Sequence, residues 1–303
     1  MSELAAKLSS TVAKVLRGKD EAIELAVTAL LAGGHLLIED HPGVGKTLLA
    51  RSLARALDLP FQRVQCTADL LPADIVGGQV YNPRTGELSF RQGPVFTSVL
   101  LADELNRTPP RTQSALLECM AERSVTVDRV THALPDPFFV VATQNPMTSA
   151  GTYPLPENQL DRFLLRLTLG HPDAEHEIDV VAAEDGHRLA ADVQPVATRD
   201  DLLAERRRID GVRCDRELAA FVVELANRTR HSGDLLSGVS TRGAQALHRA
   251  CRARAHVLGR DYVVPDDVRA LLVPAWGHRL QLRGGADAEA VLHEVLATTA
   301  LPD

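Results

Sequence analysis

The segment that most restricts the fold is EDHPGVGKT, residues 39–47. It follows HLLIE (35–39), an apolar run that predicts a short buried strand. It leads into KTLLARSLARALDL (46–59), whose leucines and alanines recur at helical spacing. A strand, a glycine-containing loop and a helix in this order are typical of a phosphate-binding loop. We therefore predict that the residues of this loop bind the phosphates of a nucleotide. They are Pro42, Gly43, Val44, Gly45, Lys46, Thr47 and Leu48.

One position departs from the pattern G-x-x-x-x-G-K-[ST], because Asp40 stands where the first glycine is expected. Aspartate tolerates left-handed backbone angles better than most residues. Its carboxylate would have to face away from the phosphates. Lys46 supports a functional loop, since it is the last lysine in a chain where only four of 33 basic residues are lysines. A compact ammonium fits among phosphates better than the wide fork of an arginine.

Polar side chains follow two further apolar runs. SVLLA (98–102) ends at Asp103 and Glu104, and FFVVATQ (138–144) ends at Asn145. Short apolar runs that alternate with helical segments predict a parallel sheet with helices on both faces, and such sheets bind ligands at the carboxyl ends of their strands.

We expect Thr47 and Asp103 to hold Mg²⁺, and Glu104 to orient or deprotonate an attacking water. Asn145 is placed to hydrogen-bond the γ-phosphate or that water, although an Asn-Pro turn without a catalytic role explains it nearly as well.

Two arginines are further candidates. Arg242 follows GVST (238–241) and so falls in the first turn of a predicted helix, where a cation is unfavourable by about 0.3–1 kcal/mol unless an anion is near. A bound phosphate would supply that anion. Arg162 lies in LPENQLDRF (155–163) beside Asp161, and a local salt bridge is an equally good reading of it.

The chain divides into an α/β domain over residues 1–172, a linker over 173–198 and a small helical domain over 199–303. Residues 78–90 form two short segments around an Asn-Pro-x-x-Gly turn, and residues 123–134 alternate β-branched and polar residues, so each stretch predicts a β-hairpin insert. Tyr81, Phe90 and Trp276 are expected to fill cores.

Apolar runs, cysteine spacing and net charge argue against several classes of protein. No charge-free apolar run reaches the length of a membrane span, and the first residues lack the features of a signal peptide, so we expect no membrane span and a cytoplasmic location. The four cysteines form no CxxC pair, which argues against a zinc site or a disulfide framework. A net charge of −7 makes nucleic acid an unfavourable partner.

Five segments in order, DHPGVGKT, VLLADELNR, VVATQNP, LPENQLDRF and GVSTRGAQAL, together with the two inserts, resemble the MoxR group of AAA+ ATPases. The resemblance covers the chain from about residue 10 to its end. It implies a P-loop core followed by an all-helical lid, and Mg²⁺-dependent ATP hydrolysis in a homo-oligomer that forms a hexamer or another ring. Residues other than glycine are usual in this group at the position of Asp40.

The resemblance also implies roles for single residues. Residues 40–47 match the Walker A loop, Asp103 and Glu104 match Walker B, and Asn145 matches a sensor. Arg162 matches the arginine finger that reaches the ATP of a neighbouring subunit, and Arg242 matches the second sensor, carried by the lid.

In this group the activity serves chaperone-like remodelling, maturation or activation of partner proteins, among them proteins with von Willebrand factor A domains. Two other readings remain open. One is a nucleic-acid-dependent motor, as in MCM-like proteins with the same inserts, against which the acidic balance counts. The other is an ATP-gated scaffold without turnover, which the presence of both Glu104 and Arg162 disfavours.

Overall fold

The computed structural model describes residues 1–84, 86–146, 151–182 and 186–301. Its centre is a parallel five-stranded sheet in the order β2-β5-β8-β1-β9. The β5 strand is buried along its whole length, as expected for a sheet covered on both faces. The strands are β1 (Leu36–Glu39), β2 (Phe61–Gln65), β5 (Val99–Asp103), β8 (Phe139–Gln144) and β9 (Leu165–Leu167).

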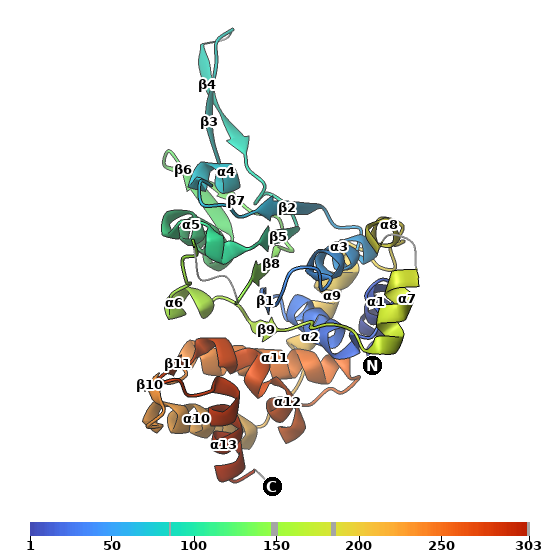
Figure 1. The fold of residues 1–303 in the computed structure, drawn as a ribbon, viewed down its shortest axis with the longest axis vertical. Helices are drawn as coiled ribbons and strands as arrows, with labels where there is room; N and C mark the ends of the chain where they lie inside the picture. Colours follow the sequence, from blue (N-terminus) through green and yellow to red (C-terminus); the bar gives the residue numbers. More distant parts are fainter. Residues whose placement is uncertain (85, 147–150, 183–185, 302–303) are drawn as a thin grey trace.

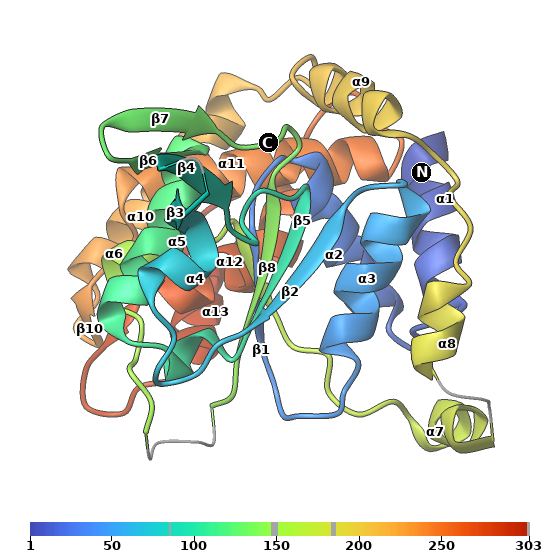
Figure 2. The same cartoon turned by 90° about the horizontal axis from the view of Figure 1, so that it is seen from above.

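Helices cover both faces of this sheet (Figure 2). Successive side chains of a strand point to opposite faces, and in β1 Leu36 and Ile38 join one apolar core while Leu37 joins the other. The first core contains α1 (Glu3–Ala13), α2 (Asp20–Leu31) and α3 (Lys46–Ala56), and the second contains α4 (Pro72–Val76) and α5 (Pro110–Glu122). The short α6 (Glu157–Leu160) borders the second core through Leu160. The predicted α/β architecture is confirmed.

Both predicted hairpins are present. They are β3 (Gly77–Asn82) with β4 (Glu87–Gln92), and β6 (Ser124–Val127) with β7 (Val130–Ala133). The β3–β4 hairpin projects far from the domain (Figure 1). Phe90 of β4 stacks on His132 of β7 with ring centroids 4.2 Å apart, which joins the two hairpins near their bases. Tyr81 was expected to fill a core, which is wrong: it is 60% exposed on β3.

The segment predicted as a linker contains two helices, α7 (Ala174–Ala182) and α8 (Gly186–Ala191). Its last part packs against the α/β domain, since the amides of Val196 and Ala197 both donate to the carbonyl of Ala56 at the end of α3. Val193 is buried in the first core. The segment is therefore not a free tether, although the boundaries at 172 and 199 stay a prediction.

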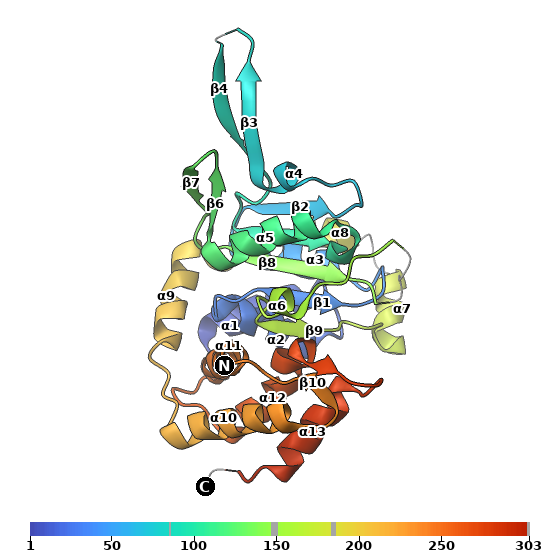
Figure 3. The same cartoon turned by 90° about the vertical axis from the view of Figure 1, so that its left-hand side faces the viewer.

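The C-terminal region forms a lid below β9, the edge strand of the sheet (Figure 3). Trp276 is fully buried there, as predicted, and its indole donates to the carbonyl of Gly243. The lid is helical, as predicted, except for two short antiparallel strands that pair within it. Its elements are α10 (Arg216–His231), β10 (Leu235–Ser237), α11 (Thr241–Val257), α12 (Pro265–Trp276), a 3₁₀ turn η2 (Gly277–Arg279), β11 (Gln281–Leu282) and α13 (Ala288–Thr298). The helix before them, α9 (Arg199–Ile209), lies beside the sheet and contacts α1 and α2.

Two arginines bind the carboxyl end of α2, one from α9 and one from the lid helix α11. Arg206 of α9 donates to the carbonyl of Leu30, and Arg249 of α11 donates to the carbonyl of Ala32. The last carbonyls of a helix have no partner within the helix and carry partial negative charge, so arginines are favourable partners for them. Among the residues that the structure describes, no helix is long and apolar enough to cross a membrane.

Candidate active site

The loop between β1 and α3 has the shape of an anion-binding turn. Gly43 and Gly45 have φ angles of 87° and 102°, which side chains of L-residues disfavour. A Cβ atom on Gly45 would also lie 2.6 Å from Cδ1 of Leu16. Val44 is buried and anchors the turn. The helix that starts at Lys46 leaves its first amides without partners inside the helix, and these amides and the helix dipole attract an anion.

Asp40 has a structural task behind this loop. Its φ angle is not positive, so the left-handed conformation considered from the sequence is not needed. One carboxylate oxygen accepts from the amide of His41 at 2.8 Å, and the other accepts from the amides of Leu169 and Gly170, both at 2.6 Å. Burial alone would raise the pKa of Asp40, but these three hydrogen bonds lower it overall. The carboxylate thus joins the end of β1 to the chain that leaves β9.

The Lys46 ammonium lies at the entrance of the loop. It donates to the backbone carbonyls of Asp40 and His41, at 2.5 and 3.1 Å. Neither acceptor is a carboxylate. A phosphate that binds Lys46 would therefore replace hydrogen bonds to neutral carbonyls and would not have to break an ion pair. Burial lowers the pKa of Lys46, while the nearby carboxylates of Asp40, Asp103 and Glu104 act in the opposite direction.

The second wall of the site is built where β5 and β8 end. Asp103 accepts from the Thr143 hydroxyl through Oδ1 and from Nη2 of Arg63 through Oδ2, both at 2.6 Å. Thr143 also accepts from the amide of Glu104 at 2.8 Å. Glu104 has φ 57° and ψ 48°, a left-handed conformation that costs on the order of 1–3 kcal/mol in a residue other than glycine. Such strain is concentrated at functional sites.

Two residues of β2 complete this wall. Neither of them is predicted from the sequence. Arg63 and Gln65 alternate with the buried Val64 and so share one face of the strand. Gln65 donates to Oε2 of Glu104 at 3.2 Å. Asn145 follows the last residue of β8, and the carbonyl of Asn145 accepts from the side-chain amide of Asn106 at 3.4 Å.

The two walls enclose a cleft of about 340 Å³. Lys46 and the loop amides suit phosphate oxygens, and the hydroxyl of Thr47 and the carboxylate of Asp103 are ligands of the kind that Mg²⁺ prefers. When bound, Mg²⁺ would neutralise charge on the β- and γ-phosphates. The residues present therefore fit Mg²⁺ and a nucleoside triphosphate. The cleft is lined by Pro42, Gly43, Gly45, Lys46, Thr47, Leu48, Arg63, Gln65, Asp103 and Glu104.

Arg162 and Arg242 do not line this cleft. Both line a second cavity, of about 490 Å³, together with Gly33, Gly34 and His35, which directly precede β1. The phosphate loop follows the other end of β1, and a strand of four residues spans about 13 Å. Arg162 likewise precedes β9, which runs parallel to β1. The two arginines therefore lie near the amino ends of the strands, whereas Lys46 lies near their carboxyl ends.

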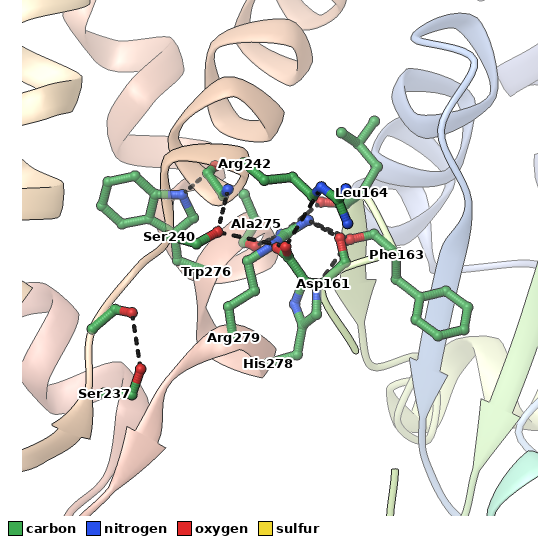
Figure 4. A network of polar contacts seen from close by, with 12 residues as sticks. Asp161, Phe163, Leu164, Ser237, Ser240, Arg242, Ala275, Trp276, His278 and Arg279 are labelled. Carbon is green, nitrogen blue, oxygen red and sulfur yellow. Dashed lines mark hydrogen bonds and ion pairs between the residues drawn. The ribbon is translucent and has the colours of Figure 1, made fainter. Parts of the chain in front are cut away.

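Near the amino ends of the strands, Arg162 donates from Nη1 to the carbonyl of Leu117 at 2.7 Å. Nε of Arg242 lies 4.0 Å from Oδ2 of Asp161 (Figure 4), and the Arg242 side chain is 67% exposed. The local salt bridge that the sequence left open for Arg162 is not formed, since Asp161 faces the lid instead. The structure thus brings the two predicted arginines together, and keeps both away from the cleft of their own subunit.

Comparison with known proteins gives the class to which this fold and site belong. Residues 35–165 match a family described as "ATPase family associated with various cellular activities (AAA)", and residues 227–295 match an AAA lid domain. A crystal structure from Cytophaga hutchinsonii, described as that of a candidate ATPase, superposes with a TM-score of 0.90. It is 36% identical, covering 99% of this chain and 96% of that one. The protein is an AAA+ ATPase.

Two relatives match almost the whole chain, and the first of them narrows this class. The chaperone MoxR1 of Mycobacterium tuberculosis (strain ATCC 25618 / H37Rv) is 37% identical over 96% of this chain and 80% of its own length. The uncharacterized protein YeaC of Bacillus subtilis (strain 168) is 43% identical over 99% of this chain and 95% of its own length. The chain belongs to the MoxR family.

Proposed function

We propose that this protein hydrolyses ATP with Mg²⁺ between the subunits of a ring, and uses the hydrolysis for chaperone-like remodelling, maturation or activation of partner proteins. The observation that carries the proposal is the division of the site. The cleft holds Lys46, Thr47, Asp103 and Glu104, whereas Arg162 and Arg242 lie near the opposite, amino ends of the strands. Arginines there can serve an ATP molecule only if it is bound by another copy of the chain.

Each side chain then has a task set by its chemistry. Lys46 and the loop amides hold the phosphates, and Thr47 and Asp103 hold the metal. Glu104 takes up the proton of an attacking water, and Asn145 hydrogen-bonds the γ-phosphate or that water. Arg162 and Arg242 of a neighbour stabilise the charge that develops on the transferred phosphoryl group. Head-to-tail contacts of this kind close into a ring, and we propose a hexamer.

The partner surface that we propose is the β3–β4 hairpin. Val80, Tyr81 and Leu88 are 46, 60 and 66% exposed on it. Exposed apolar and aromatic side chains on a projecting element are typical of a protein-binding surface. They favour a protein partner over nucleic acid, which would call for a basic stripe. A von Willebrand factor A domain as the partner, and a cytoplasmic location, rest on the family resemblance and the sequence.

Glu104→Gln separates an ATPase from a scaffold that only binds ATP. The substitution keeps the size of the side chain and removes the carboxylate, so ATP binding should persist while turnover falls at least about 100-fold. Equal turnover in Glu104→Gln and wild type would contradict the role of Glu104, and wild type without turnover in an assembled ring would favour the scaffold. Stimulation of turnover by DNA would favour the nucleic-acid motor.

A further inference from the structure

An ion pair between a buried arginine and a partly buried aspartate connects the lid to the segment that carries Arg162 (Figure 4). Arg279 of the η2 turn is only 3% exposed, and its Nε lies 2.8 Å from Oδ1 of Asp161. Its guanidinium also donates to the backbone carbonyls of Phe163 at 2.6 Å, Leu164 at 3.3 Å and Asp161 at 3.4 Å. A further bond to the carbonyl of Ala275 stays within the lid.

The acceptors of Arg279 are concentrated rather than spread over the interface. Apart from Ala275, all of them belong to residues 161–164, the segment that carries Arg162. Docking of the lid has another support, because Arg249 of α11 binds the end of α2. A contact that served only to join the two domains would not need four donor–acceptor contacts on one turn of chain.

Asp161 also reaches the first turn of α11. Besides Arg279, its carboxylate is 3.5 Å from the hydroxyl of Ser240, the N-cap residue of α11, and 4.0 Å from Nε of Arg242. One carboxylate thus faces three groups of the lid and directly precedes Arg162 in the chain. Asp161 and Arg279 together thus connect the chain next to Arg162 with the first turn of the helix that carries Arg242.

We propose that Asp161 and Arg279 are positioning residues, which hold Arg162 and Arg242 in the arrangement that the ATP of a neighbouring subunit requires. The inference rests on the proposed function, because it assigns the pair to a site shared between subunits. Neither residue touches the nucleotide. A shift of the two arginines by about 1 Å would be enough to lower turnover by up to about 100-fold.

Arg279→Gln alone should lower kcat by about 10- to 100-fold and leave ATP binding by the subunit's own cleft unchanged. Arg279→Lys keeps the charge but not the planar fork, and should restore turnover only in part. The matched control is Arg206→Gln, which removes a largely buried arginine of α9 with bonds to α2 and none to residues 161–164. If Arg206→Gln lowers kcat as much as Arg279→Gln at equal assembly, the pair has only a structural role and the inference fails.

Mixed assemblies test the direction of action. Arg279→Gln subunits keep an intact cleft, and Glu104→Gln subunits keep intact arginines, so the two should complement each other when they are assembled together from an equal mixture. About a quarter of the sites then combine an intact cleft with an intact neighbour, and turnover should recover to about a quarter of the wild-type value. Asp161→Asn, which changes one atom of the side chain, is a second variant for the same mixture if Arg279→Gln fails to assemble.

A parallel mixture of Arg162→Ala with Glu104→Gln distinguishes the failures. If that mixture recovers turnover and the Arg279→Gln and Asp161→Asn mixtures do not, the positioning role is wrong and the shared site stands. If no mixture recovers, the shared site itself is wrong, and the inference falls with it.

Discussion

The carboxylate of Asp103 and the guanidinium of Arg63 are paired, with Oδ2 and Nη2 separated by 2.6 Å. Asp103 is the predicted ligand of Mg²⁺, so Arg63 occupies a position where it competes with the metal for one carboxylate oxygen. The pair is partly open to solvent, since the Arg63 side chain is 47% exposed, and its free energy is therefore at the weak end, about 0.2–1 kcal/mol.

Removing Arg63 should make Mg²⁺ bind more readily. In Arg63→Gln the Mg²⁺ concentration for half-maximal ATPase activity should fall by up to about fivefold, which corresponds to the upper end of the free energy of the pair. Arg63→Lys keeps a positive charge and should change this concentration less. A higher Mg²⁺ requirement in Arg63→Gln would show that the guanidinium assists the metal site instead of competing with it.

Asp40 should contribute to stability and not to phosphate binding. Asp40→Asn removes the charge that accepts three backbone hydrogen bonds, and should lower the free energy of unfolding by about 2–3 kcal/mol in urea titrations. Asp40→Gly should not tighten ATP binding, because the carboxylate is bonded to the chain after β9. Much tighter binding of ATP by Asp40→Gly would contradict this placement.

The lowered pKa of Asp40 sets the pH range of its contribution. The stabilisation is present above the pKa of the unfolded chain, near 3.8, and is lost as the pH falls through the still lower pKa of the folded state. The difference in unfolding free energy between wild type and Asp40→Asn should therefore be constant at neutral pH, and shrink only below about pH 4. A difference that changed between pH 6 and 8 would not fit.

His35 should make the fold sensitive to mild acid. It is buried, accepts from the amide of Val140 through Nδ1 and pairs with the carbonyl of Met120 through Nε2. Burial lowers the pKa of His35 to about 3. The unfolded chain takes up a proton near pH 6.5 and the folded chain does not, so stability falls as the pH drops below 6.5.

The slope due to His35 is at most about 1.4 kcal/mol per pH unit. His35→Gln should remove this share of the pH dependence between pH 6.5 and 5, measured by urea unfolding at several pH values. His278 is buried with its pKa lowered as well, so part of the dependence should remain. Identical pH slopes in wild type and His35→Gln would contradict a neutral, buried His35.

The exposed side chains of β3 should be needed for the partner and not for ATP. Tyr81→Ser together with Val80→Ser should leave unstimulated turnover within about twofold, since the hairpin projects from the domain and neither residue lines the cleft. Proteins captured by Glu104→Gln with ATP, and identified by mass spectrometry, should be lost when the two hairpin substitutions are added. Capture of the same proteins with and without the hairpin substitutions would place the partner surface elsewhere.

Local patterns predicted the parts of the site that are continuous in sequence. The loop at 42–48 and the carboxylates at 103 and 104 follow apolar runs directly, so the order of strand, loop and helix was enough to find them. Arg63 could not be found in this way, because its approach to Asp103 depends on β2 lying beside β5 in the sheet. Sheet order is a tertiary property that strand patterns do not contain.

The arrangement of residues near the amino ends of the strands was the least predictable part of the structure. Asp161 and Arg279 are 118 residues apart and meet only because the lid packs below β9. The same packing gathers Arg162 and Arg242, which the sequence could suggest singly but could not place relative to Lys46. The helices α7 and α8 were missed because 171–195 reads as a charged junction without a clear apolar period.

The most direct test of the account is the ATPase rate per subunit as a function of protein concentration, for wild type and Arg162→Ala, with the assembly state measured in the same samples. The divided site predicts that wild-type turnover per subunit rises with concentration as the ring assembles, and that assembled Arg162→Ala is at least about 100-fold slower while it still binds ATP. Turnover per subunit that is independent of concentration and unchanged in Arg162→Ala would contradict a site shared between subunits.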